Sequence, residues 1–171
     1  GKCLKSCPSL NGVPASGYAA PQVYAAWNRN EEIRVLSTSG GVFTALAESI
    51  ICQGGFVAGA FYDENFQICH GVVSSLHEIP RLRQSKYAQS RIGSTFTQVR
   101  SLLKQGHTVL FCGTPCQSAG LQRFLGNEYK NLYCCDFICR GVISPKVYVK
   151  FLKDMQPAED TKLSLVHFKN K

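Results

Sequence analysis

The chain has 171 residues, of which 44% are hydrophobic and 18% are charged, and its formal net charge is +8 at pH 7. This composition is that of a globular domain with one packed core and excludes a disordered chain. No apolar stretch reaches the ~20 residues of a membrane-spanning helix. The basic residues are spread along the chain, without the clustering typical of nucleic-acid-binding proteins. The first residues lack the apolar core of a signal peptide. We therefore expect a cytoplasmic protein with no nucleic-acid partner.

The first third of the chain contains a predicted loop, a predicted strand and a predicted helix. Residues 1–17 are rich in Pro, Gly and Ser, which predicts a loop or linker. Residues 23–27 are β-branched and aromatic enough to predict a strand. The hydroxyl- and glycine-rich residues 37–41 precede an apolar stripe over residues 42–51. This pattern predicts a helix that is capped by the hydroxyls and ends at Gly54.

The rest of the chain alternates predicted strands and helices. The pattern predicts strands at residues 56–62, 69–73, 108–112, 132–138 and 162–168. It predicts amphipathic helices over residues 96–103, around Leu121 and Leu125, and from Ser144 onward, where Pro145 suits the first turn. The run at residues 108–112 is almost continuously apolar, as in a buried parallel strand. The alternation predicts an α/β fold, with a mixed, largely parallel sheet flanked by helices.

The nine cysteines suggest metal, cluster or redox chemistry, because an odd number in a cytoplasmic chain argues against a disulfide scaffold. Cys3 and Cys7 precede Pro8 in a C-x3-C-P pattern, which matches the end of a ferredoxin-type cluster motif. The plainer alternative is two exposed thiols in a flexible tail. Cys52 and Cys69 lie in apolar segments, where we expect them to be core residues.

Two further pairs share a C-x3-C spacing, Cys112 with Cys116 and Cys135 with Cys139. Four thiolates from two strand-to-loop junctions can hold an iron-sulfur cluster or zinc. Strand alternation predicts that Cys135 and Cys139 share one face and that Cys134 lies on the other. Cys116 is predicted near a helix N-terminus, a position that suits redox or ligand chemistry. The alternatives are small buried hydrophobic residues, or a reversible dithiol of Cys112 and Cys116.

Two polar segments are candidates for cofactor binding. Residues 37–41 precede a predicted helix, where unpaired amides and the helix dipole favour a phosphate group. An ordinary helix cap explains the same residues. Residues 85–90, SKYAQS, combine a cation, an aromatic ring and hydroxyls, which suit either a ring system with a phosphate or a polar loop.

Taken in order, four segments resemble the signature blocks of the coenzyme F-420 hydrogenase/dehydrogenase beta subunit family. They are residues 39–43 (SGGVF), 85–90 (SKYAQS), 111–121 (FCGTPCQSAGL) and 135–145 (CDFICRGVISP). Residues 1–17 resemble the end of the ferredoxin-like domain that precedes this region in many members. The resemblance implies that residues 18–171 are a flavin-binding α/β domain, incomplete at its C-terminus, in a chain cut at both ends.

The resemblance implies an oxidoreductase that uses FAD and a 4Fe-4S cluster. It would pass electrons between iron-sulfur clusters and a hydride-carrying small molecule such as deazaflavin coenzyme F-420, with a ferredoxin-like or hydrogenase-like protein or subunit as redox partner. Carried over by position, the residues that would line the flavin are Ser39, Gly40, Gly41, Ser85, Lys86, Tyr87, Gln89, Ser90, Gly113, Thr114 and Pro115.

The same resemblance makes Cys116 and Cys139 the best candidates for cluster ligands and Cys112 and Cys135 weaker ones, with Cys3 and Cys7 belonging to the preceding cluster motif. Arg140 stands where the family usually has His, and Arg can neither accept a proton nor ligate a metal. Lys86 or Arg91 is expected to stabilise the reduced, anionic flavin or its phosphates. The alternative function is a structural zinc module held by Cys112, Cys116, Cys135 and Cys139.

Overall fold

We describe a computed structural model of the chain, covering residues 2–12, 20–156 and 163–168, and the side chains from residue 4 onward. The strands are β1 (Phe56–Tyr62), β2 (Ile68–Val73), β3 (Val109–Gly113) and β4 (Leu132–Asp136). The helices are α1 (Lys2–Ser6), α2 (Pro8–Asn11), α3 (Glu31–Val35), α4 (Val42–Cys52), the 3-10 helix η1 (Leu76–Glu78), α5 (Ile79–Leu82), α6 (Thr95–Lys104), α7 (Pro115–Leu125) and α8 (Pro145–Asp154). None of the described helices is long and apolar enough to cross a membrane.

The four strands form one mixed sheet in the order β2-β1-β3-β4. β1 and β2 are antiparallel, whereas β1 pairs with β3, and β3 with β4, in parallel. The predicted α/β fold with a largely parallel sheet is therefore confirmed. In this topology the carboxyl ends of β1, β3 and β4 meet at one edge of the sheet, and β2 begins there. We call this the carboxyl edge.

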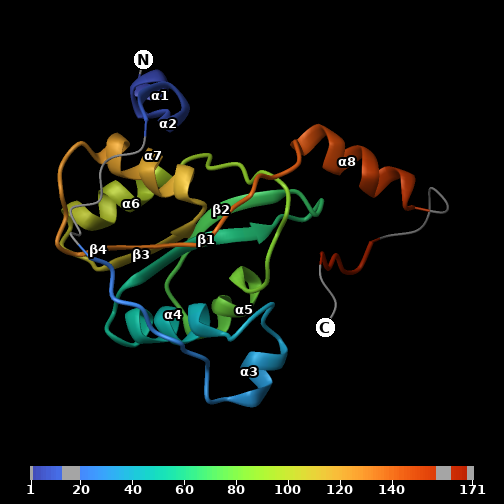
Figure 1. The fold of residues 1–171 in the computed structure, drawn as a ribbon, viewed down its shortest axis with the longest axis horizontal. Coiled ribbons are helices and arrows are strands. Elements are labelled where there is room, and N and C mark those ends of the chain that lie inside the picture. Colours follow the sequence, from blue (N-terminus) through green and yellow to red (C-terminus); the bar gives the residue numbers. More distant parts are fainter. Residues whose placement is uncertain (1, 13–19, 157–162, 169–171) are drawn as a thin grey trace.

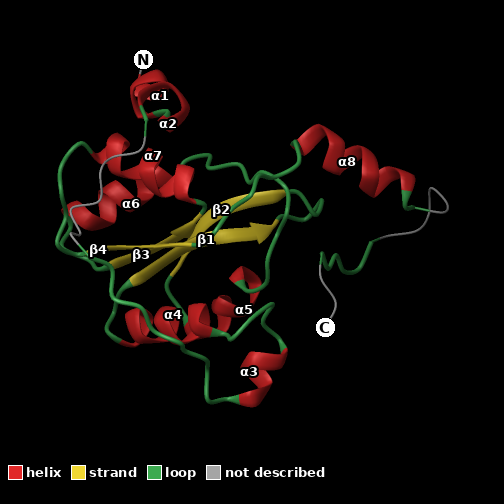
Figure 2. Ribbon diagram, viewed as in Figure 1, coloured by secondary structure: helices red, strands yellow, loops and turns green. Residues whose placement is uncertain are grey.

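Helices cover both faces of the sheet, as Figure 2 shows. One core lies between the sheet and α4 with α5, and contains Val57, Leu110 and Ala47. The other lies between the sheet and α6 with α7, and contains Phe111, Val99 and Leu121. The alternation of Leu110 and Phe111 between the two cores follows from the period-two geometry of a strand. Because β3 is buried on both faces, its sequence is continuously apolar.

A third, smaller core lies beyond the sheet, under α8. Tyr148 and Leu152 of α8 pack with Ile68 and Ala88, and the Tyr148 hydroxyl donates to the Phe66 carbonyl at 2.9 Å. The predicted start of α8 is confirmed, because the Ser144 hydroxyl accepts from the Val147 amide in the N-cap geometry. Figure 1 shows α8 set apart from the two helical layers.

Three secondary-structure predictions are wrong. Residues 2–11 form the short helices α1 and α2 instead of a loop, because α1 packs on α7 and Asn11 donates from its amide nitrogen to the Leu4 carbonyl. Residues 23–27 and 163–168 form no strand, since no described segment pairs with them. Residues 1, 13–17 and 162 of these predictions lie outside the described part. Cys52 is exposed at the end of α4, contrary to the expected core position.

Candidate functional site

The predicted cofactor segments meet at the carboxyl edge. Residues 83–91 run along it, pairing with β2 through the bridge between Cys69 and Arg91 and with the segment after β4 through the bridge between Ala88 and Ile143. The Gln89 backbone amide donates to the Ile143 carbonyl at 3.1 Å, and the Ile143 backbone amide donates to the Tyr87 carbonyl at 3.3 Å. The fourth signature block is thus joined directly to the second.

Side-chain hydrogen bonds join the third block, and the residue that precedes the first block, to the same segment. The Thr38 hydroxyl accepts from the Ser85 amide at 2.9 Å, which connects the loop before α4 to residues 85–90. The Gln117 side chain donates to the Ser90 hydroxyl at 2.8 Å and accepts from the Thr114 amide at 3.0 Å. Four segments that lie far apart in the sequence are therefore assembled at one edge of the sheet, where open α/β sheets bind their ligands.

The start of α4 differs from the predicted hydroxyl cap. Its N-cap is Gly41, in the left-handed conformation with φ 74°, and no side chain caps the helix. The Ser37 hydroxyl donates instead to the Ile33 carbonyl at 2.6 Å, and Thr38 is bound to Ser85. The prediction of hydroxyl capping is wrong: Ser37 and Thr38 have other partners, and the Ser39 hydroxyl does not cap the helix either. The first amides of α4 are left without a side-chain cap.

The glycines at the predicted flavin site have local steric roles. A Cβ on Gly41 would lie 3.1 Å from the Asn28 Cβ, and one on Gly40 would lie 3.1 Å from the Ala26 carbonyl oxygen. Gly113 is buried, and a Cβ there would lie 2.9 Å from the ring of Phe111. Packing alone accounts for these glycines. Their predicted approach to a flavin stays a prediction.

The two cations predicted to act on the flavin, Lys86 and Arg91, are hydrogen-bonded to other groups of the protein. The Lys86 ammonium donates to the Arg83 carbonyl at 2.7 Å, and so caps the C-terminal end of α5. Burial lowers the pKa of Lys86 to about 8. Arg91 donates to the Asp63 carboxylate at 2.8 Å and to the Cys69 sulfur at 3.2 Å. Lys86 would have to exchange its partners to bind a phosphate, whereas Arg91 uses only its Nη2 in these contacts and its side chain is 59% exposed.

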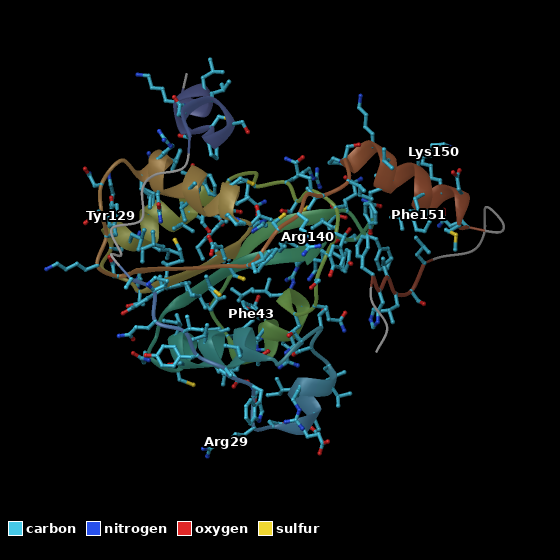
Figure 3. The ribbon with its side chains drawn as sticks, in the orientation of Figure 1. Arg29, Phe43, Tyr129, Arg140, Lys150 and Phe151 are labelled. Carbon is cyan, nitrogen blue, oxygen red and sulfur yellow. The ribbon has the colours of Figure 1, made fainter. Side chains whose placement is uncertain are left out.

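The remaining predicted flavin residues differ in their accessibility. Ser39, Gln89 and Tyr87 are exposed, whereas Ser85, Ser90, Thr114 and Pro115 are half-buried. Arg140, labelled in Figure 3, is exposed on the segment that joins β4 to α8. The exposed members can contact a ligand that lies over the carboxyl edge without rearrangement of the core.

Two hollows on the surface lie beside this edge and include none of the predicted flavin residues. One, of about 560 Å³, is bounded by Gln67 and by Lys146, Lys150 and Lys153 of α8. The other, of about 510 Å³, is bounded by residues 61–65 and Arg81. Both are open surface depressions, and the predicted flavin segments themselves line neither.

The two C-x3-C pairs are brought together only at their first cysteines. Cys112 and Cys135 are direct register partners on β3 and β4, so their thiols lie on the same face of the sheet. The neighbouring Cys135 thiol and burial raise the pKa of Cys112, and the neighbouring Cys112 thiol lowers the pKa of Cys135. Cys135 packs beside the core under α4, whereas Cys134 reaches Gln122 of α7. Cys134 and Cys135 thus lie on opposite faces, as predicted.

Cys116 and Cys139 lie apart from that pair. Cys116 is exposed in the first turn of α7, as predicted, with its sulfur 3.1 Å from the Thr114 hydroxyl. Cys139 accepts from the Gly141 amide at 3.4 Å, in a loop, because β4 ends at Asp136. The prediction that strand alternation places Cys139 beside Cys135 is therefore wrong.

No three Cys, His, Asp or Glu side chains among the described residues are arranged to hold a metal ion. A four-thiolate site, for a 4Fe-4S cluster or for zinc, is thus not assembled in this arrangement of the loops. Cys7 is half-buried at the start of α2, and the side chain of Cys3 lies outside the described part. The ligand roles of all six cysteines stay predictions.

Sequence reasoning missed His70, in the middle of β2. This side chain is 7% exposed, stacks on Phe111 and lies with its Nε2 3.2 Å from the Cys112 carbonyl. Its Nδ1 has no hydrogen-bond partner among the described residues. Burial lowers the pKa of His70 to about 4, and the nearby Lys86 charge acts in the same direction. The only signal in the sequence was a polar residue at an inward position of an alternating strand.

Comparisons with known proteins add no identification. No protein-family model matches the chain, and no curated protein matches it either. The functional assignment therefore depends on the geometry of the carboxyl edge and on the segments gathered there.

Proposed function

We propose that the chain is the flavin-binding part of an oxidoreductase similar to the coenzyme F-420 hydrogenase/dehydrogenase beta subunits, with FAD bound over the carboxyl edge. The observation that carries the proposal is the joining at that edge of three signature segments, through Ser90, Gln117 and Ile143, and of Thr38, which directly precedes the remaining segment, through Ser85. Ligands of open α/β sheets lie outside the carboxyl ends of the strands.

The local chemistry supports an anionic cofactor. The first amides of α4 carry no side-chain cap, and the positive end of an 11-residue helix favours a phosphate. The exposed Tyr87 ring provides a stacking surface, and the exposed side-chain amide of Gln89 provides a hydrogen-bonding group. The net charge of +8 favours the approach of anions. In the proposed enzyme these residues bind and orient the flavin.

A bound flavin supplies hydride chemistry coupled to one-electron transfer, and the protein sets its position and surroundings. A 4Fe-4S cluster with Cys116 and Cys139 as ligands belongs to the proposal, as does a redox protein or subunit that exchanges electrons with it. Since the thiols of Cys116 and Cys139 lie apart from the Cys112–Cys135 pair, cluster binding requires the loop after β4 to change its path.

The test begins with the chain, and a longer protein that contains it, purified without oxygen. Absorption spectra with iron, sulfide and zinc assays then report the cofactors. Flavin bands together with a broad iron-sulfur absorption that bleaches with dithionite would support the proposal. A colourless protein with stoichiometric zinc would replace it by the zinc module, and a protein with neither cofactor after reconstitution would reject it.

A pair of matched variants tests the position of the flavin. Gln89→Ala removes an exposed amide at the carboxyl edge, whereas Gln105→Ala makes the same change after α6, at the amino end of β3. We expect flavin affinity to fall about tenfold for Gln89→Ala, the loss of one good hydrogen bond, and to stay unchanged for Gln105→Ala. Equal affinities in both variants would place the flavin elsewhere.

A further inference from the structure

Cys112 and Cys135 form a pair that the sequence did not suggest. They come from different C-x3-C motifs, 23 positions apart in the sequence, yet they face each other across two neighbouring parallel strands. Both thiols are free and half-buried, and each of them shifts the pKa of the other. Their nearest cysteines along the chain point elsewhere, since Cys134 faces α7 and Cys116 lies against Thr114.

We propose that Cys112 and Cys135 are a redox-active dithiol that closes to a disulfide and opens again. A small-molecule disulfide such as oxidised glutathione is the oxidant. One cysteine sulfur attacks it, releasing one glutathione thiol and leaving a mixed disulfide. The second cysteine then attacks that bond, forming the bond between Cys112 and Cys135 and releasing a second thiol. Two protein thiols are oxidised and one small disulfide is reduced to two thiols, so that atoms and electrons balance.

The sheet brings the two residues within the range of a disulfide. Neighbouring strands lie ~4.7–4.9 Å apart, and the Cα atoms of disulfide-bonded cysteines lie ~4.4–6.8 Å apart. The register between Cys112 and Cys135 places the two side chains on the same face of the sheet. By contrast, Cys116 follows a turn into α7, and no bond joins its thiol to that of Cys112 among the described contacts.

The same geometry makes the bond reversible. Side chains on a ladder stand roughly perpendicular to the sheet, so the two sulfurs must lean toward each other while the strands hold the backbone in place. Strained disulfides are more easily reduced, and these are the labile, regulatory or catalytic ones. β4 is the outer strand of the sheet, and its position gives a small reagent access to Cys135.

This inference goes beyond the proposed function and does not depend on flavin. It also assigns a different role to the two cysteines that were the weaker candidates for cluster ligands. The redox pair is specific to the contact between the strands, and the exposed Cys116 and the loop residue Cys139 do not take part in it.

The test uses the full chain, treated with a chelator, reduced, and equilibrated in buffers of reduced and oxidised glutathione. Trypsin then yields residues 105–123, with Cys112 and Cys116, and residues 131–140, with Cys134, Cys135 and Cys139. We expect these peptides to appear linked, at a mass lower by two hydrogens than their sum, with fragmentation assigning the bond to Cys112 and Cys135. Reduced glutathione in excess should separate them.

Three variants give the controls. Cys135→Ser should abolish the linked peptide, whereas Cys134→Ser, the adjacent residue on the other face, and Cys139→Ser should leave its amount unchanged. Circular dichroism verifies that each variant is folded. A bond from Cys112 to Cys116, a bond through Cys134 or Cys139, or no linked peptide at any buffer ratio would overturn the inference. None of these results bears on flavin binding, which is measured separately by absorption.

Discussion

The two C-x3-C motifs have the same spacing and very different surroundings. In the first, Cys112 is the last residue but one of β3, which is buried on both faces, and Thr114 and Pro115 then start α7. In the second, Cys135 lies on the outer strand, and Cys139 follows in an open loop. The residues between the cysteines account for the difference. Thr and Pro start a helix, whereas Asp, Phe and Ile continue a chain that has no further partner strand.

The contacts around the motifs differ in the same way. Three contacts fix the first motif. The preceding Phe111 packs in the core, the His70 ring lies against the Cys112 carbonyl, and the Gln117 side chain accepts from the Thr114 amide. The second contacts the rest of the protein mainly through Cys135 and the pairing of Ile143. Equal cysteine spacing therefore does not imply equal rigidity. We expect the first motif to act as a fixed support and the second to be the part that adjusts to a ligand.

The largest expected effect comes from two aromatic residues, Phe111 just before the first motif and Phe137 within the second. Phe111→Ala should lower the free energy of unfolding by about 3–5 kcal/mol, because it leaves a cavity in a fully buried site. Phe137→Ala, the same change at a side chain that is 54% exposed, should alter the free energy of unfolding by less than about 0.5 kcal/mol. Urea unfolding curves measure both. Similar losses for the two variants would contradict the contrast between a fixed and an adjustable motif.

The second prediction concerns pH and His70. Above pH 6.5 the His70 imidazole is neutral in the folded and in the unfolded chain. Below pH 6.5 it becomes protonated in the unfolded chain, whereas in the folded chain it stays neutral until the pH reaches about 4. Stability should therefore fall as the pH falls from about 6.5 to 4, by up to about 3 kcal/mol from this group. His70→Gln should flatten that part of the stability curve, measured by urea unfolding at each pH. The matched variant His77→Gln changes an exposed histidine, and an equal flattening there would remove His70 as the cause.

The smallest expected effect concerns the link between the first motif and residues 85–90. Gln117→Ala removes the bonds to Ser90 and to the Thr114 amide, and should lower the free energy of unfolding by about 1–2 kcal/mol. Ser90→Ala removes one of these bonds and should cost about half as much. Gln98→Ala, an exposed glutamine on α6, serves as the control in thermal and urea unfolding. A neutral Gln117→Ala would show that the segments are held together by other contacts.

Much of the fold could be predicted from local pattern. The apolar run of β3, the hairpin of β1 and β2, and the helices α4, α6, α7 and α8 each carry their own periodicity or cap. Residues 23–27 have the composition of a strand, but a strand also needs a partner, and none of the described segments pairs with them. The short helices α1 and α2 depend on packing against α7, which local composition does not report.

The candidate site was predictable in its residues and less so in its contacts. The segments were chosen by their resemblance, and the structure brings them to one edge of the sheet. The facing of Cys112 and Cys135 depends on the register between β3 and β4, which the cysteine spacing does not specify. The hydrogen bond from the Lys86 ammonium to the Arg83 carbonyl forms only in the folded protein, so the sequence pattern did not predict it either.

The packing of α1 and α2 on α7 has a consequence for the order in which the protein folds during synthesis. Arg123 of α7 donates to the Gly12 carbonyl at 3.1 Å, across 111 positions of the sequence. At ~5–20 residues per second, a ribosome needs roughly 6 to 20 seconds to reach that partner. Helices of five and four residues are not stable alone. The helices α1 and α2 are therefore among the last described parts of the chain to fold, and during that interval a chaperone or a protease meets them as unfolded chain.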